Sequence, residues 1–260
     1  MSARDQALVA TPGFPRYFRI AGHWINSYKV FLCVGIYFGI LLSAAVAERS
    51  GISPLRVGAG CLLCAVLGLI GARVYHLVVN FPAHRRAGFW KSAWNPQSGG
   101  WSVFGGLVIV PFSLMLDSMF GIPVPVFWDH MAVGIAFGGA WIRFGCVCNG
   151  CCVGRESHGW FALRQHDIHS IDKRRIPAQW IEIGWWLLAC VGLLWLWPKH
   201  LPPGCYAFAV LAWYGFGRSW QEPLREGTDL VFGRVRLNQV VGALLAMVAG
   251  AGFFLTATLE

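Results

Sequence analysis

The chain has 260 residues, of which 56% are hydrophobic and 13% are charged, and its formal net charge is +9 at pH 7. Soluble domains carry about 25% charged residues, so this composition excludes an ordinary soluble domain and indicates an integral membrane protein. The 14 tryptophans fit that class, because indole rings gather at the level of the lipid headgroups.

Apolar runs follow one another along the chain, and a transmembrane helix needs about 20 apolar residues. The sequence predicts spans at 30–47, 57–79, 104–120, 124–141, 176–197, 204–217 and 237–256. We therefore expect an all-α polytopic membrane protein with about seven transmembrane helices, forming a single integral membrane domain over 1–260. The loops 82–101, 145–175 and 218–236 are long enough to hold a functional site, because sites usually lie on loops carried by a rigid scaffold.

Several arginines lie at depths where a charge is costly. Arg73 lies inside the second span, Arg143 ends a long apolar run, and Arg218 and Arg225 flank the end of the sixth span. A charge at such depth usually marks a pathway or a polar cavity, and a guanidinium there needs an anion. The anions that the chain itself offers are Glu182, Glu222, Glu226, Asp129 and Asp229. Phosphate is the obvious external candidate, because the guanidinium fork matches its oxygens bidentately.

Four of the nine cysteines are crowded into the segment GAWIRFGCVCNGCCVGRESHGW, at Cys146, Cys148, Cys151 and Cys152. A structural zinc site usually pairs two C-x2-4-C units or one such unit with histidines, and a second unit is missing here although histidines follow. A disulfide inside the cluster is a second interpretation, and it requires an oxidising compartment. The cluster by itself leaves both interpretations open.

The glycines of the same segment favour a third interpretation. Gly145, Gly150 and Gly154 recur through it, and glycine permits positive φ and close approach of the backbone to a ligand. Successive backbone N–H groups in such a loop form a nest that accepts an anion, and Arg143 stands two residues before it. We favour a loop that grips an anion, with the cysteines as small packing residues and with no metal.

Five segments in order are similar to segments of one known family. DHMAVGIAFGGAWIRFGCVCNGCCVG resembles the signature of prolipoprotein diacylglyceryl transferases, in which an apolar helix ends in an arginine and glycine pattern followed by Asn-Gly. The other four are INSYKVFLCVGIYFGILL, GLIGARVYHLVVNF, SGGWSVFGGLV, and YGFGRSWQEPLREGTD followed by LNQ. These matches are collinear and cover about 30–255, so the resemblance extends over nearly the whole chain.

The resemblance implies a seven-span enzyme of the bacterial inner membrane whose helices surround a polar lipid-binding cavity. Such an enzyme moves a diacylglyceryl group from phosphatidylglycerol to a cysteine thiol near the start of an exported lipoprotein precursor. It needs no cofactor. Its partners are thus an anionic phospholipid and a prolipoprotein.

The resemblance also assigns roles to residues of this chain. Arg143 and Arg225 are expected to converge from distant helices on the phosphate of one lipid headgroup. Asn149, Gly150 and Gly154 are expected to shape the loop beside it. The cavity is expected to be lined or braced by Tyr28, Arg73, Glu222 and Asp229. The double glycine of the family corresponds to Gly105 and Gly106.

The chain also departs from the family pattern. Phe104 stands where the family has a histidine, and a phenylalanine cannot accept a proton. His76, three residues after Arg73, is the candidate replacement, and His130 is another. Two alternatives to the family's reaction stay open: a divergent paralogue that uses another lipid or acceptor, and a non-enzymatic membrane protein that binds an anion or a metal in a cavity lined by arginine and cysteine.

Overall fold

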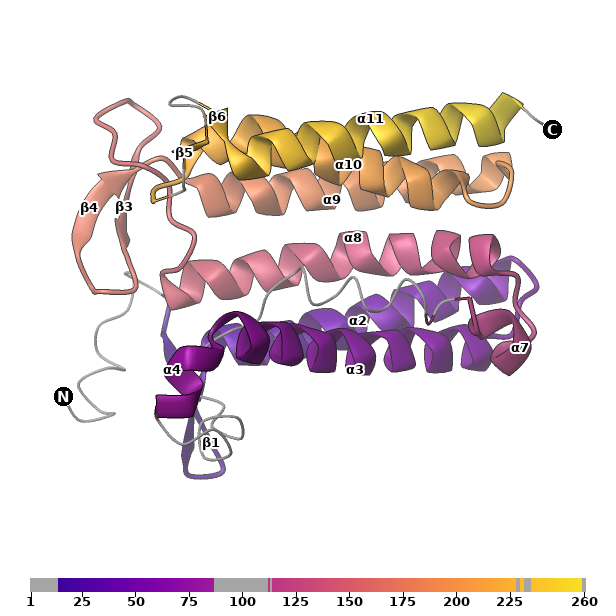
Figure 1. Cartoon of the computed structure of the whole chain (residues 1–260), viewed down its shortest axis with the longest axis horizontal. Coiled ribbons are helices and arrows are strands. Elements are labelled where there is room, and N and C mark those ends of the chain that lie inside the picture. Colours follow the sequence, from indigo (N-terminus) through magenta and orange to yellow (C-terminus); the bar gives the residue numbers. More distant parts are fainter. Residues whose placement is uncertain (1–13, 87–111, 113, 228–229, 232–234, 259–260) are drawn as a thin grey trace. The chain divides into compact units, whose positions relative to one another are not determined.

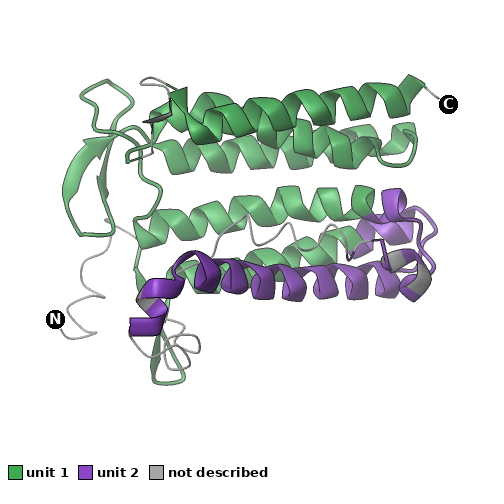
Figure 2. Ribbon diagram, viewed as in Figure 1, with its two compact units in different colours: residues 1–43, 128–260 green, residues 44–127 purple. Residues whose placement is uncertain are grey.

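The computed structural model describes residues 14–86, 112, 114–227, 230–231 and 235–258 (Figure 1). The chain divides into two compact units, unit 1 with residues 1–43 and 128–260 and unit 2 with residues 44–127 (Figure 2). Within the described residues, five helices are long and apolar enough to cross a membrane. The prediction of an all-α membrane protein is therefore confirmed, whereas the single domain over 1–260 stays a prediction.

The helices are α2 (Ser27–Arg49), α3 (Pro54–Val79), α4 (Phe81–Arg86), α7 (Leu116–Phe120), α8 (Val124–Asn149), α9 (Ala178–Leu196), α10 (Cys205–Gln221) and α11 (Leu237–Thr258), with the 3-10 turns η2 (Trp197–Lys199) and η3 (Glu222–Leu224). The described residues also form three antiparallel pairs of short strands: β1 (Tyr17–Ile20) with β2 (His23–Asn26), β3 (Leu163–His166) with β4 (Asp172–Arg175), and β5 (Leu230–Val231) with β6 (Val235–Arg236).

Six of the predicted spans coincide with α2, α3, α8, α9, α10 and α11. Most of the remaining one, 104–120, lies outside the described residues, and α7 forms its end.

Two loop boundaries were predicted wrongly. The loop expected to start at 218 begins only after Gln221, where α10 ends. The loop expected to start at 145 begins only after Asn149, because α8 continues for about one and a half further turns. Gly145 does not break this helix: a Cβ there would lie 2.9 Å from Cβ of Phe31, so glycine serves the contact with α2. The helix ends instead before Gly150, whose φ of 72° is the left-handed conformation typical of a helix C-terminus.

Helices α9, α10 and α11 of unit 1 lie side by side (Figure 1). Trp185 and Trp213 stack with their ring centroids 4.0 Å apart, and each indole N–H donates to the backbone carbonyl of the other residue, at 3.1 and 3.0 Å. Between α10 and α11, a Cβ on Gly242 would lie 2.7 Å from the carbonyl oxygen of Gly215, so the two backbones are in direct contact. These contacts fix α9 and α10, which carry polar groups of the site.

Asp129 in α8 serves the fold of unit 1 and is not an arginine partner in the described structure. Its carboxylate accepts from the backbone N–H of Gly204 at 2.6 Å and of Ala207 at 2.8 Å. These are free N–H groups at the start of α10, and a carboxylate there both satisfies them and complements the helix dipole. Asp129 therefore ties α8 to α10.

Unit 2 is built around α3, which packs with α4 and α7. A Cβ on Gly60 would lie 2.6 Å from the ring of Phe127, so this glycine admits the aromatic ring. Nδ2 of Asn80, which ends α3, lies 3.2 Å from Nδ1 of His76, and the ring of His76 packs edge-on against His84.

Within unit 1, α2 and α8 touch through glycines. A Cβ on Gly35 would lie 2.8 Å from the carbonyl oxygen of Gly138, and one on Gly39 would lie 2.8 Å from that of Gly134. In a membrane, small residues spaced four apart let helices approach closely, and van der Waals packing then holds them together.

We predict that Gly134→Leu separates α2 from α8 and reduces the yield of folded, monodisperse protein in detergent several-fold. The matched control is Gly192→Leu on α9, where an added Cβ meets nothing within 4 Å. Fluorescence-detected size exclusion with a melting scan measures both variants. Equal behaviour of the two variants would refute the glycine contact.

Candidate active site

The polar side chains of unit 1 gather where the end of α8, the start of α9 and the end of α10 meet. They are Arg143, Glu182, Arg218, Glu222 and Arg225, and each is buried or half-buried. A buried charge without a partner is strongly destabilising, so their pairing decides what the site can bind.

Glu182 is the centre of this group. Nε of Arg143 lies 2.5 Å from Oε2 of Glu182, and Nε of Arg225 lies 3.4 Å from Oε1. The residue is only 4% exposed. The two arginines that the sequence predicts to converge therefore lie at the two oxygens of one buried carboxylate.

Glu222 is the second buried carboxylate, with no exposed surface. Its Oε2 lies 2.8 Å from Nη2 of Arg218 and 3.8 Å from Nη1 of Arg225, and its Oε1 accepts from Nδ2 of Asn238 at 2.8 Å. Arg225 thus contacts both carboxylates and joins the two ion pairs into one network.

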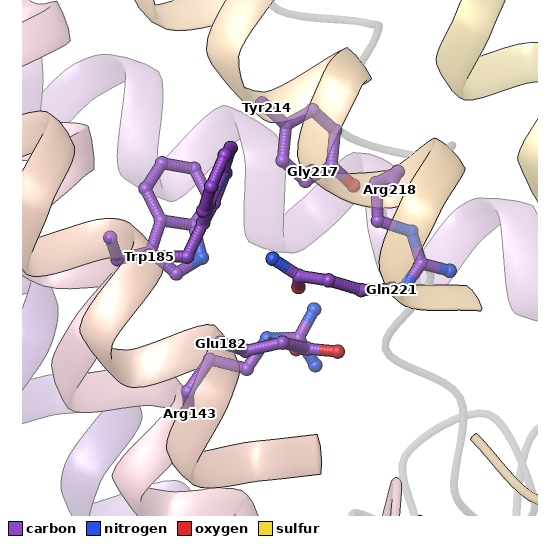
Figure 3. Close-up of a pocket in the computed structure, with 8 residues that line it drawn as sticks. Arg143, Glu182, Trp185, Tyr214, Gly217, Arg218 and Gln221 are labelled. Carbon is purple, nitrogen blue, oxygen red and sulfur yellow. The ribbon is translucent and has the colours of Figure 1, made fainter. Parts of the chain in front are cut away.

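A small pocket, with a volume of about 10 Å³, opens inside this network. Its lining residues are Arg143, Glu182, Trp185, Trp186, Tyr214, Gly217, Arg218 and Gln221. Figure 3 shows Gln221 between Trp185 and Arg218, with Arg143 and Glu182 next to each other. Among the described residues, Nη1 of Arg218 and Nε2 of Gln221 are buried N–H donors without a hydrogen-bond partner. Such donors mark a place for an acceptor that the described residues do not supply.

The turn after α8 is tied to Arg225 through the backbone. Gly154 and Arg225 form an antiparallel bridge, and the N–H of Glu226 donates to the carbonyl of Val153 at 3.1 Å. Nε2 of Gln179, on the first turn of α9, donates to the carbonyl of Cys151 at 2.9 Å. The turn therefore fixes the position of the Arg225 backbone.

Three of the four clustered cysteines come together at this turn. The Sγ atoms of Cys146, Cys151 and Cys152 lie within 4.8 Å of one another. Hydrogen bonds from the thiols of Cys146 and Cys151 lower the pKa of Cys152 well below its ordinary value, and the charges of Arg225 and Arg143 add to this effect. Of the three sulfurs, that of Cys152 therefore lies in surroundings that favour a thiolate.

Arg175 at the end of β4 is a buried arginine that the sequence did not single out. Its side chain is 1% exposed, Nη2 lies 3.2 Å from Oδ2 of Asp167, and Nη1 contacts the carboxylate of Glu226. Nη1 also donates to the carbonyl of Gly154 at 3.4 Å. This guanidinium joins the β3–β4 hairpin to the turn and to the segment that carries Arg225.

The other residues predicted for the site fall into three groups. Tyr28 and Asn149 lie in unit 1, where Nδ2 of Asn26 donates to Oδ1 of Asn149 at 2.7 Å and the backbone of Tyr28 lies against Gly145. Arg73 and His76 lie on α3, in unit 2. The predicted residues that lie outside the described part of the chain are Gly105, Gly106 and Asp229, together with Phe104.

The pocket also contains residues that were not assigned to the site. The sequence indicates Glu182 and Arg218 only as charges that need partners, and it gives no functional signal for Gln221. The spacing offered a signal: Tyr214, Arg218 and Glu222 stand four residues apart, so on a helix they share one face.

A family model described as "Prolipoprotein diacylglyceryl transferase" matches residues 15–256 of the chain. A phosphatidylglycerol–prolipoprotein diacylglyceryl transferase of Streptomyces avermitilis is 28% identical over 225 residues, which are 82% of this chain and 64% of that protein. The protein of the same description from Streptococcus pyogenes serotype M5 (strain Manfredo) is 26% identical over 242 residues, which are 88% of each chain. The chain thus spans just under two thirds of the Streptomyces relative and most of the streptococcal one.

We predict that Arg175→Ala destabilises the protein by about 3 kcal/mol, because it removes one partner of a buried ion pair and leaves two carboxylates without their cation. The matched control is Arg164→Ala on the neighbouring strand β3. That side chain is 73% exposed and pairs with Asp172, so its loss costs less than about 1 kcal/mol.

Denaturant or thermal unfolding in detergent compares the two variants. An Arg175→Ala protein as stable as the Arg164→Ala protein would show that this guanidinium does not hold the hairpin to the turn.

Proposed function

Because the chain belongs to the prolipoprotein diacylglyceryl transferase family, we propose that it moves a diacylglyceryl group from phosphatidylglycerol to the cysteine thiol of an exported prolipoprotein. Members of this family act in lipoprotein biosynthesis, and the chain is a multi-pass protein of the bacterial cytoplasmic membrane.

The pocket beside Glu182 is the proposed place of the lipid phosphate. The observation that carries this proposal is the pair of buried N–H donors without partners, Nη1 of Arg218 and Nε2 of Gln221, in a pocket that Arg143 also lines. Phosphate oxygens accept from guanidinium and amide N–H groups. A pocket of this size admits the phosphate only after side chains shift, so lipid binding includes a local rearrangement.

Arg143 and Arg218 are the proposed direct contacts of the phosphate. Arg225 is not among the lining residues, and it contacts Glu182 and Glu222 instead. We therefore assign Arg225, for which the motif predicted a direct contact, to a positioning role. It fixes the positions of the two carboxylates, and these in turn orient Arg143 and Arg218.

Glu182 is the proposed counter-ion of the empty site. Two buried guanidinium groups would be destabilising without an anion, and the Glu182 carboxylate supplies one in the absence of lipid. When phosphate enters, Arg143 exchanges part of its contact with Glu182 for a contact with the lipid.

The chemistry places new negative charge on the phosphate. The acceptor thiolate attacks the glyceryl carbon next to the phosphate ester, the carbon–oxygen bond breaks, and charge builds on the departing glycerol phosphate. Guanidinium groups that contact this phosphate stabilise the transition state, with its greater negative charge, more than the ground state, which raises the rate.

The remaining predicted residues keep their proposed roles. Asn149, Gly150 and Gly154 shape the turn beside the site, and Glu222 braces it. The lipid path is proposed to be lined by Tyr28, Arg73, Gly105, Gly106 and Asp229. His76 is proposed to assist proton transfer.

We predict that Arg143→Gln and Arg218→Gln each lower kcat/KM for transfer by about 100-fold or more, because each removes a preorganised donor to the developing charge. Arg225→Gln lowers it less, and Arg225→Lys restores part of the loss because a cation then returns to the two carboxylates. Mass spectrometry of a lipoprotein-derived cysteine peptide, with phosphatidylglycerol vesicles as donor, measures the transfer.

Arg164→Gln, an exposed arginine of β3, is the control for charge loss alone. Full activity of a folded Arg143→Gln protein would contradict the proposal that the lipid phosphate binds in this pocket.

We further predict that expression of the chain restores growth to a bacterium depleted of its own prolipoprotein diacylglyceryl transferase, and that the Arg143→Gln variant does not. Restored lipid modification is read on a membrane lipoprotein of the host by mass spectrometry. A folded, membrane-inserted wild-type chain that fails in this experiment would contradict the proposed acceptor and favour a paralogue with another one.

A further inference from the structure

Three thiols meet at the end of α8 without a role in the site as described so far. The Sγ atoms of Cys146, Cys151 and Cys152 lie within 4.8 Å of one another, whereas Cys148 does not belong to this group among the described residues. Cys146 lies in the last turn of the helix and is buried. Gly150 and Cys152 both have positive φ, 72° and 59°. The chain reverses direction at this turn, so that the thiols of Cys151 and Cys152 lie close to that of Cys146.

The spacing of the sulfurs fits one metal ion. With Zn–S bonds of about 2.3 Å, the sulfurs of a tetrahedral zinc site lie about 3.8 Å apart. The observed separations, at most 4.8 Å, are within about 1 Å of this value. The C-x2-4-C rule that argued against zinc applies to structural sites, whereas a catalytic site has three protein ligands and one open position.

The surroundings select a soft divalent ion. The ligand atoms are all sulfur, and thiolates favour zinc or copper(I) over magnesium or calcium. Arg143 and Arg225 act electrostatically on Cys152, and both also contact the Glu182 carboxylate. Once a bound metal ion has displaced the protons of the three thiols, the thiolates and this carboxylate exceed the two cations by two charges, which a divalent ion neutralises.

We propose that Cys146, Cys151 and Cys152 bind one Zn²⁺ ion, and that the open position of this ion takes the thiol of the acceptor protein. The metal site stands on the arrangement of the sulfurs alone, whereas the role of its open position rests on the proposed transferase function.

The ion would ionise the acceptor thiol, for which the family histidine, replaced here by Phe104, is missing. A thiol bound to zinc loses its proton, here to water. The zinc-bound sulfur then forms a bond to the glyceryl carbon, the carbon–oxygen bond to the phosphate breaks, and the electron pair leaves with the glycerol phosphate beside Arg143 and Arg218. The resulting thioether is a weaker ligand, and water replaces it. The acceptor thiol is thus ionised without the histidine of the family.

Metal analysis of the purified, reduced full-length protein tests the site without any activity measurement. After chelation and titration with Zn²⁺, we expect one ion per chain, and with Co²⁺ we expect a thiolate-to-metal charge-transfer band in the near ultraviolet. Cys152→Ala and Cys151→Ala should weaken Zn²⁺ binding at least tenfold, whereas the matched control Cys148→Ala should bind like the wild type.

The outcomes decide between the parts of the proposal. A wild-type chain that binds no stoichiometric Zn²⁺, or variants at 148 and 152 that bind equally, would overturn the metal site. Because Cys152 is exposed, its variant is expected to fold, and a melting scan checks this. If it does not fold, the wild-type stoichiometry and the Co²⁺ band still decide.

The role of the open position is tested separately. A cysteine-containing acceptor peptide should shift the Co²⁺ spectrum by adding a fourth sulfur, and the serine peptide should not. Zinc binding without this shift would overturn the thiol-binding role alone. Zinc binding with the shift, but with no transfer from phosphatidylglycerol, would refute the proposed function and leave the site in place.

Discussion

The carboxylate of Glu182 is the contact on which the rest of the polar centre depends. It lies between two guanidinium groups that reach it from different parts of the chain, Arg143 from α8 and Arg225 from the segment after η3. Because all three groups are buried or half-buried, none of them is stable there alone. The same carboxylate therefore joins α8 to the segment after η3 and lies beside Arg143 in the lining of the pocket.

The backbone around the turn after α8 gives this ion pair its geometry. Gly154 pairs with Arg225 through a backbone bridge, and Gln179 holds the carbonyl of Cys151. Arg175 adds a second anchor through Asp167 and Glu226. The position of Arg225 is therefore set by one backbone bridge and by side-chain contacts of Gln179 and Arg175.

The site combines groups suited to the two halves of one transfer. Arginine and glutamine N–H donors line the pocket that would hold a phosphate, and three thiols lie by the same arginines. Membership in the prolipoprotein diacylglyceryl transferase family fits the first half, which is the binding of the donor lipid by its phosphate. For the second half, the proposed metal ion on Cys146, Cys151 and Cys152 would ionise the acceptor thiol.

The sequence by itself determined the membrane class, the family, and six helices whose ends, except that of α8, were predicted within a few residues, because long apolar runs and ordered motifs are local signals. It also identified Arg143 and Arg225 as buried cations. Only the tertiary structure decided which anion pairs with them, that Arg218 and not Arg225 lines the pocket, and that Cys146, Cys151 and Cys152 share one point in space. Pairing among distant charges depends on helix packing and on the path of a turn, and neither leaves a periodic pattern in the sequence.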